Sequence, residues 1–377
     1  MELETGKRGR TVVRRKPAVG SSTAVAKKQS SFAKKRNNRL KKLSENFKLV
    51  SCVCTHHCRG KNVREILAIV RKRFPNIEIM REDPGWIIRW AALKEMLIFR
   101  PPYHDDYRQR LLDEFPTLAA AEVVSSSEVQ NIAERSATML VRMVRAAARD
   151  KKVVNVGVAG GHTIRAFMRA LATELTLWVS GMPEVIHFRA LAAGFNPSDP
   201  STNPNAFVGF FDNRLIPVQL QFTGLSAPSI VGPDTFEPLK QIEDIKAAFE
   251  SVNDIDIFVT SGSSWHKCDV LSMRMPEADR KLLEEQEIIG DLLWRPISKR
   301  GPIEIELSRR AFTLVELRQL KQFAKQGKQV LLTLAPCGIC RELKGRLLNC
   351  ALEHEIVTHV VVDTRSAGQA LGEKIGS

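Results

Sequence analysis

Residues 153–163 read VVNVGVAGGHT, and their pattern is the strongest local indication of the class of fold. A short apolar run is followed by Gly160 and Gly161, and an amphipathic segment opens at Thr163. Such a run is typical of a strand buried in a parallel sheet, and the glycines allow a tight turn into a helix. Free backbone amides at a helix start attract anions, and a threonine hydroxyl can donate to a phosphate. The stretch therefore predicts a strand–turn–helix unit, which serves either as an anion site or as a tight turn without ligand.

Alternating strand and helix patterns continue on both sides of this unit. Strands are predicted at 121–124, 184–188, 256–260, 329–334 and 357–362, and helices at 107–115, 128–149, 163–175, 238–251, 277–286, 313–326 and 340–353. Alternation of this kind is typical of a mostly parallel sheet with helices on both faces. We therefore predict an α/β fold with a Rossmann-like parallel sheet for residues 101–377.

A small helical unit is predicted at residues 47–100. One helix is expected at 62–74, and a second at 83–96, where Asp83 suits the N-cap and Pro84 the first helical position. Residues 97–99 predict a short strand before two prolines. Two helices and a strand favour a winged helix-turn-helix.

The second of these helices is the candidate DNA-recognition element. Arg81, Arg89 and Lys94 lie on its polar side, where they could contact nucleic acid. The alternative is a helix whose Trp86 and Trp90 merely pack into a core.

Positive charge is concentrated at the N-terminus. Residues 1–46 carry 14 Lys/Arg against three acidic residues, whereas the remaining 331 residues carry 43 against 39. With few apolar residues, this tail is expected to be disordered, and a basic tail attracts polyanions. DNA is the preferred partner, with an anionic membrane surface or a merely solubilising arm as alternatives.

Compartment signals favour the cytoplasm. No run of 18 apolar residues is present, and the N-terminus lacks the apolar core of a secretion signal. Seven cysteines, an odd number, do not suggest a disulfide framework. We expect a cytoplasmic protein without a membrane partner.

Two cysteine-containing segments are candidate metal or redox sites. Residues 52–58 read CVCTHHC, but four tetrahedral ligands from so short a loop are sterically awkward, so a local loop with free thiols is preferred to a zinc site. Cys337 and Cys340 have Cys-x-x-Cys spacing at the start of a predicted helix, and a redox role is the weaker alternative there. We therefore expect neither a metal nor a cofactor. The candidate zinc ligands would be Cys52, Cys54, His56, His57 and Cys58.

Several segments, taken in order, resemble the SorC/DeoR family of sugar-binding transcriptional regulators. The Gly-Gly-x-Thr turn is similar to the family's phosphate turn. The other similar segments are 110–124, FRALAAGF at 188–195, DIDIFVTSGS at 254–263, IGDL at 289–292, and the closing 337–344 and 357–363. Together they span about 270 residues.

The resemblance implies a domain similar to sugar-phosphate isomerases, with ligand at the carboxyl ends of the strands. By this analogy the glycine turn and Lys344 hold a phosphate, Asp291 lies near sugar hydroxyls, and His187 and Arg189 face the pocket. This sequence departs from the family at Thr260 to Ser263 and by carrying a histidine in the turn. The predicted ligand residues are Gly160, Gly161, His162, Thr163, His187, Arg189, Asp291 and Lys344.

The resulting prediction is a DNA-binding transcriptional regulator and not an enzyme. Residues 1–46 form a basic tail, 47–100 a DNA-binding domain and 101–377 a domain that senses a phosphorylated sugar. The resemblance implies a homodimer or homotetramer. Two alternatives stay open: a sugar-phosphate isomerase or deaminase on the same scaffold, for which no general base stands out, and a nucleic-acid-associated protein with a degenerate sugar site.

Overall fold

The computed structural model describes residues 39–58, 61–93, 104–177, 181–194, 199–214, 216–265, 270–338 and 340–373. Contacts divide the chain into two compact units, one within residues 1–99 and the other within 100–377. Each unit is built around its own apolar core.

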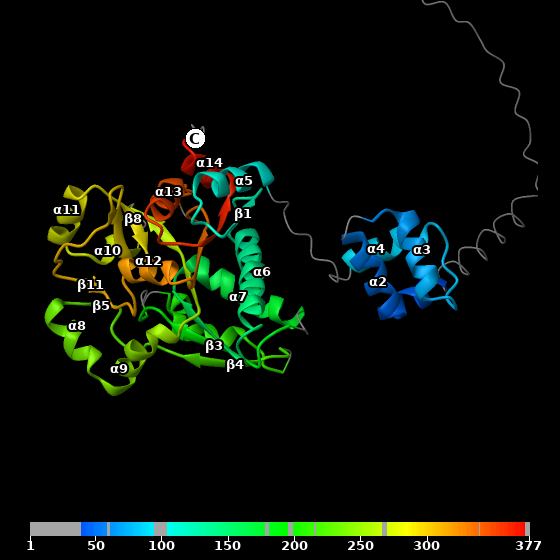
Figure 1. Ribbon diagram of the computed structural model, residues 1–377, viewed down its shortest axis with the longest axis horizontal. Helices are drawn as coiled ribbons and strands as arrows, with labels where there is room; N and C mark the ends of the chain where they lie inside the picture. Colours follow the sequence, from blue (N-terminus) through cyan, green and yellow to red (C-terminus); the bar gives the residue numbers. More distant parts are fainter. Residues whose placement is uncertain are drawn as a thin grey trace, which may run out of the picture. The chain divides into compact units, whose positions relative to one another are not determined.

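A seven-stranded sheet forms the centre of the larger unit (Figure 1). Every neighbouring pair of strands in it is parallel. The central strands are buried on both faces, which explains their near-continuous Val, Ile and Leu content. The predicted α/β fold is therefore confirmed. In spatial order the strands are β1 (Ala120–Val124), β13 (His359–Asp363), β12 (Gln329–Leu334), β6 (Ile257–Thr260), β2 (Val153–Val158), β3 (Val185–Ala190) and β4 (Gln219–Thr223).

Helices cover both faces of this sheet. Helices α6 (Val129–Ala147) and α7 (His162–Leu177) pack on each other, and the Ser136 hydroxyl of α6 lies 2.7 Å from that of Thr333 on β12. On the other face, Phe323 of α12 (Leu317–Lys325) stacks on Phe258 of β6, with ring centroids 5.0 Å apart. Phe258 is in register with Val330, and alternate strand residues point to opposite faces, so Thr333 and Phe258 point in opposite directions.

The larger unit contains further helices and 3₁₀ turns. They are α5 (Asp105–Glu114), α8 (Pro233–Lys240), α9 (Glu243–Glu250), α10 (Val270–Arg274), α11 (Glu277–Glu285), α13 (Gly345–Glu353) and α14 (Thr364–Ala370), with 3₁₀ turns η1 (Pro200–Thr202), η2 (Pro204–Phe210) and η3 (Ser251–Asp254).

A small antiparallel sheet continues from the carboxyl end of β6. Its order is β10-β9-β8-β7, and the sequence patterns did not predict it, because its strands are short. A two-stranded pair, β5 with β11, lies nearby in the fold. These strands are β7 (Gly262–Ser264), β8 (Ile288–Leu292), β9 (Arg295–Ser298), β10 (Gly301–Pro302), β5 (Ile230–Val231) and β11 (Arg310–Ala311).

Two predicted helices are wrong in extent. The single helix expected over 238–251 is two helices, α8 and α9, because Ile242 adopts an extended backbone (φ −65°, ψ 128°) and caps the second helix. The helix expected over 340–353 begins only at Gly345. Before it, Arg341 has a left-handed backbone (φ 58°), and its amide closes a turn on the Cys337 carbonyl (3.0 Å).

The smaller unit contains three helices with assigned bounds: α2 (Phe47–Cys58), α3 (Val63–Arg73) and α4 (Asp83–Leu93). Residues 39–45 are also helical, and Leu40 and Leu43 are buried in the core of this unit, although their neighbours are mostly basic. The unit therefore begins before residue 47. The wing predicted at 97–99 and residues 1–38 of the predicted tail lie outside the described residues.

The predicted loop at 52–58 is wrong, because these residues belong to α2. Cys52 and Cys54 are buried with Leu49 and Val53 in the core of the small unit, so apolar packing explains their position. Among the described residues, no group of three or more potential ligands could hold a metal ion.

None of the helices in the described part of the chain is both long and apolar enough to cross a membrane.

Candidate functional site

The glycine turn joins β2 to α7 as the sequence predicts. Gly161 has φ +105°, a conformation that favours glycine, and its amide donates to the Thr202 carbonyl at 2.9 Å. The first intrahelical bond runs from the Arg165 amide to the Gly161 carbonyl (2.8 Å). The amides of His162, Thr163 and Ile164 precede it and have no acceptor within the helix. These three N–H groups, with the positive end of α7, form an anion-attracting site.

Gly160 is required by close packing. A Cβ atom at this position would lie 2.5 Å from Cη2 of Trp294, 2.7 Å from the Thr202 carbonyl oxygen and 2.9 Å from Cδ of Pro204. The indole of Trp294 therefore covers the turn. The patterns did not single out this tryptophan, because it lies more than 130 residues from the turn in sequence.

Lys344 lies at the same edge of the sheet. It is the N-cap residue of α13 and only 6% exposed, and its ammonium donates to the Gly262 carbonyl at 2.7 Å. Gly262 begins β7, just after β6 ends, and β6 is the neighbour of β2. The positive charge of Lys344 contributes to the lowered pKa of His162, another predicted ligand residue.

The imidazole of His162 is predominantly neutral near pH 7. Burial lowers the pKa of His162, and the charges of Arg165 and Lys344 lower it further, whereas Asp199 opposes them. The Nδ1 atom of His162 lies 3.7 Å from Oδ2 of Asp199, and Arg165 donates to the same oxygen at 2.9 Å. Arg165 thus offsets the charge of Asp199 beside the turn. A neutral imidazole here can donate one hydrogen bond to an anion without adding charge.

Asp291 organises a hairpin at this edge. Asp291 is 2% exposed, and its carboxylate accepts hydrogen bonds from the Ser263 hydroxyl at 2.6 Å and from the Trp294 amide at 3.0 Å. Asp291 belongs to β8, and its side-chain hydrogen bonds connect this strand to β7 and to the β8–β9 turn. Asp291 is therefore hydrogen-bonded directly to the backbone of Trp294.

The β8–β9 turn has a strained backbone. Leu293 and Trp294 both have positive φ (53° and 55°), as a two-residue type I′ turn requires, although glycine and asparagine normally occupy these positions. Such outliers cost roughly 1–3 kcal/mol each and persist only where the surroundings enforce them. Here the enforced conformation holds the indole of Trp294 against Gly160.

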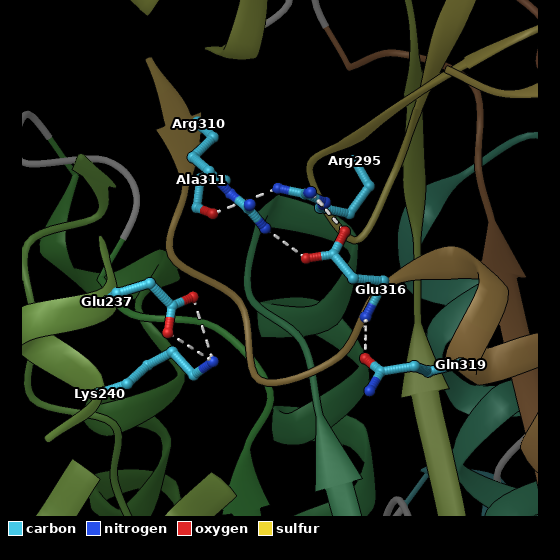
Figure 2. Close-up of polar contacts among 7 residues, drawn as sticks. All are labelled: Glu237, Lys240, Arg295, Arg310, Ala311, Glu316 and Gln319. Carbon is cyan, nitrogen blue, oxygen red and sulfur yellow. Dashed lines mark hydrogen bonds and ion pairs between the residues drawn. The ribbon is translucent and has the colours of Figure 1, made fainter. Parts of the chain in front are cut away.

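Arg295 anchors the same hairpin from its other side. Figure 2 shows the carboxylate of Glu316 between the guanidinium groups of Arg295 and Arg310, and it forms an ion pair with each. Arg295 also donates to the Ala311 carbonyl (3.4 Å), and burial lowers the pKa of its guanidinium while Glu316 opposes that shift. Glu316 in turn caps α12, where its amide donates to Gln319 at 2.8 Å. The hairpin is thus tied to the start of α12.

His187 and Arg189 are engaged elsewhere. Both belong to β3, and Arg189 is in register with Gly157 and therefore with Phe258, so they point to the face that carries α12. His187 shares a hydrogen bond with the Thr223 hydroxyl (2.8 Å), and Arg189 donates to the Ser251 carbonyl (2.8 Å). No described contact links either side chain to the glycine turn.

The basic residues predicted to contact DNA lie on the smaller unit. Arg81 and Arg89 are exposed, and Arg89 donates to the Gly85 carbonyl at 3.2 Å, while Lys94 lies outside the described residues. The structure adds exposed basic residues on α3, among them Arg64 and Lys72.

Comparison with known proteins supports this fold. No family model matches the sequence, and no curated protein matches it. Among solved structures, a DeoR family transcriptional regulator from Listeria monocytogenes is similar, with a TM-score of 0.53 and 19% identity, over 70% of this chain and 97% of that one. A probable sor operon regulator from Shigella flexneri gives 0.56 and 15%, over 70% and 98% of the chains.

A full-length structure is similar over more of the chain. The sorbitol operon regulator SorC from Klebsiella pneumoniae gives a TM-score of 0.54 and 14% identity, over 87% of this chain and 99% of that one. At such identities the likeness establishes the fold. The resemblance to SorC/DeoR regulators is thus confirmed in three dimensions.

Proposed function

We propose that this protein is a DNA-binding transcriptional regulator whose α/β unit binds a phosphorylated sugar. The observation that carries the proposal is that α7 begins just after β2, while the ammonium of Lys344 donates to the Gly262 carbonyl just after β6, the strand beside β2 in the parallel sheet. Ligands of open α/β sheets bind at that edge. The fold of the similar regulators supports the same assignment.

Each residue has a distinct role in the proposed site. The amides of residues 162–164 and the Thr163 hydroxyl donate to the phosphate, and Lys344 supplies the positive charge. Gly161 lets the phosphate approach the backbone, Gly160 leaves room for the packing of Trp294, and neutral His162 donates one further hydrogen bond. Trp294, held by Asp291, offers an apolar face to the sugar ring.

The smaller unit and the basic tail are proposed to bind DNA. The basic residues of the N-terminal segment would neutralise phosphates, and the smaller unit would place a helix in the major groove. Arg81, Arg89 and Lys94 are the proposed contacts, and exposed Arg64 and Lys72 on α3 supply further positive charge.

Effector binding would regulate DNA affinity by favouring one arrangement of a homodimer or homotetramer in the cytoplasm. A ligand shifts such an equilibrium only by its differential affinity for the two states. The expected effect of a bound sugar phosphate is therefore a change in DNA affinity without a change in DNA sequence preference.

A thermal-shift screen of sugar phosphates on the full chain tests the proposal. We expect at least one phosphosugar to raise Tm, and its unphosphorylated sugar to have a much smaller effect. Thr163→Ala and Lys344→Met should abolish the shift, whereas Thr173→Ala, an exposed threonine on the same helix, should keep it. Equal shifts in all three variants would refute the site.

DNA binding is tested separately by its salt dependence. Removing one phosphate contact should reduce the slope of log K against log salt by about 0.9. We expect Arg89→Ala to show this reduction and Arg149→Ala, an exposed arginine of the larger unit, to leave the slope unchanged. Turnover of ribose 5-phosphate or glucosamine 6-phosphate by the pure protein would favour an enzyme instead.

A further inference from the structure

A buried hydroxyl without a hydrogen-bond partner lies in the segment that follows β11. Thr313 is only 1% exposed, and its Oγ1 atom has no hydrogen-bond partner among the described residues. Buried hydroxyls are normally paired, because burial removes their hydrogen bonds to water. Valine would fill the same volume without this loss, so packing alone does not account for a threonine at this position.

Backbone pairing fixes the direction of the Thr313 side chain. Ala192 and Thr313 form an antiparallel bridge, and hydrogen bonds of 2.7 and 3.0 Å between the residues on either side flank it. A pair flanked in this way is non-hydrogen-bonded, which places its Cα atoms about 4.5 Å apart and both side chains on the same side. The Thr313 side chain therefore lies on the side to which Ala192 points.

That side carries a small apolar cluster. Ala192 and Trp294 are both buried members of it. Phe312 and Leu314, the neighbours of Thr313, belong instead to the main core of the larger unit. Since successive side chains of an extended segment point to opposite sides, Thr313 faces the cluster that contains Trp294.

The same cluster adjoins the glycine turn. The indole of Trp294 lies against Gly160, and the Leu191 amide donates to the Val158 carbonyl at 2.9 Å, just before the turn. Two strand spacings separate Thr313 from the turn, a distance of roughly 10 Å. A pentose or hexose phosphate is long enough to place its phosphate at the turn and one of its hydroxyl groups at Thr313.

We propose that Thr313 is a specificity-determining residue that binds a hydroxyl group of the sugar. The inference rests on the proposed function, because it concerns the sugar end of the ligand whose phosphate occupies the glycine turn. The Oγ1 atom both donates and accepts, so it can pair with a sugar hydroxyl in either direction. Its hydration is already lost in the free protein, so the new hydrogen bond contributes to affinity without a further desolvation cost at Thr313.

The sugar reaches this hydroxyl by displacing part of the apolar cluster. Thr313 is covered in the structure, and Trp294 is the member of the cluster that lies against the glycine turn. A ligand whose phosphate occupies the turn therefore moves the indole as its sugar enters.

Calorimetric titration of the full chain with ribose 5-phosphate, fructose 6-phosphate, glucose 6-phosphate and inorganic phosphate tests this role. For the phosphosugar that binds most tightly, Thr313→Val should weaken binding by about 10-fold or more, because a hydrogen bond is lost. Thr313→Ser keeps the hydroxyl and should bind within about 3-fold of the wild type. Inorganic phosphate has no sugar hydroxyl, so its binding should be the same in all three proteins.

Two controls separate a binding role from a structural one. Thr173→Val changes an exposed threonine of α7 and should leave the affinity for the phosphosugar unchanged. Thr313→Val without ligand should unfold at or above the Tm of the wild type, because the substitution removes an unpaired buried hydroxyl.

Deoxy analogues of the tightest phosphosugar identify the hydroxyl group that Thr313 contacts. One analogue should bind the wild type about 10-fold more weakly than its parent, whereas Thr313→Val should bind the two equally. Equal affinity of the wild type and Thr313→Val for the parent phosphosugar would overturn the inference and leave the proposed effector site intact. Failure of all three phosphosugars to bind the wild type would refute the proposed function and this inference with it.

Discussion

Replacing Gly160 by alanine tests the packing of the glycine turn directly. The added methyl group would lie within 3.0 Å of three atoms, and two of these, the Thr202 carbonyl oxygen and Cδ of Pro204, are parts of a rigid backbone and ring. Moving Thr202 also strains the bond that its carbonyl accepts from the Gly161 amide (2.9 Å). Overpacking costs about 1–3 kcal/mol and a lost hydrogen bond about 1 kcal/mol, so we expect a destabilisation of about 2–4 kcal/mol.

Thermal unfolding followed by circular dichroism measures this effect. For a unit of this size, 1 kcal/mol corresponds to roughly 2–4 °C, so a loss of about 2–4 kcal/mol in Gly160→Ala should lower Tm by roughly 4–16 °C. Gly338→Ala is the matched control, because its Cβ would meet no atom within 4 Å. We expect the control to change stability by less than about 0.5 kcal/mol. A Gly160→Ala protein with the Tm of the wild type would refute the close packing of Trp294 and Thr202 on the turn.

Three further substitutions test the hairpin and the buried histidine. Asp291→Asn removes one of two acceptors of a charged carboxylate, so it should destabilise by about 1.5–3 kcal/mol and shift the fluorescence of Trp294; an unchanged spectrum would contradict the bridging role. Glu316→Gln leaves Arg295 without its carboxylate partner, and we expect a loss of about 1–3 kcal/mol in urea unfolding, whereas a neutral result would mean that packing alone holds the hairpin. Burial lowers the pKa of His359 to about 4, below the unfolded value of 6.5. The stability that its neutral form contributes is therefore complete above pH 6.5 and is lost as the pH falls to 4. The corresponding change in the free energy of unfolding is about 3 kcal/mol. His359→Gln should lose correspondingly less stability between pH 7 and pH 4, and parallel pH profiles would show that His359 is not buried in its neutral form.

The fluorescence of Trp294 is expected to report ligand binding at the glycine turn. The indole covers the glycine turn, so a ligand that enters there must change its surroundings. Sugar phosphates that raise Tm are therefore also expected to alter tryptophan emission, and the Asp291→Asn variant should respond differently from the wild type.

Local patterns determined the central fold well. The run at 153–158 and the strand at 329–334 were predicted with the observed bounds, because strands buried on both faces must be almost wholly apolar. The glycine turn could also be predicted, because few residues other than glycine suit its two positions. Gly161 has a positive φ, and Trp294, Thr202 and Pro204 pack closely against Gly160. The helix at 39–45 was not predicted, because its two leucines lie among basic residues and give no clear apolar pattern.

What the sequence alone determined was therefore the class of fold and the chemistry of the turn, because both depend on neighbours in the chain. Only the tertiary structure placed Lys344 at the carboxyl edge of the sheet, where His162 also lies. It also pointed Arg189 to the face covered by α12 and packed Trp294 against Gly160. Those placements depend on strand order, on register and on the strained turn at Leu293 and Trp294. Contacts between residues far apart in the chain leave no periodic signal, and their geometry is fixed only when the sheet is assembled.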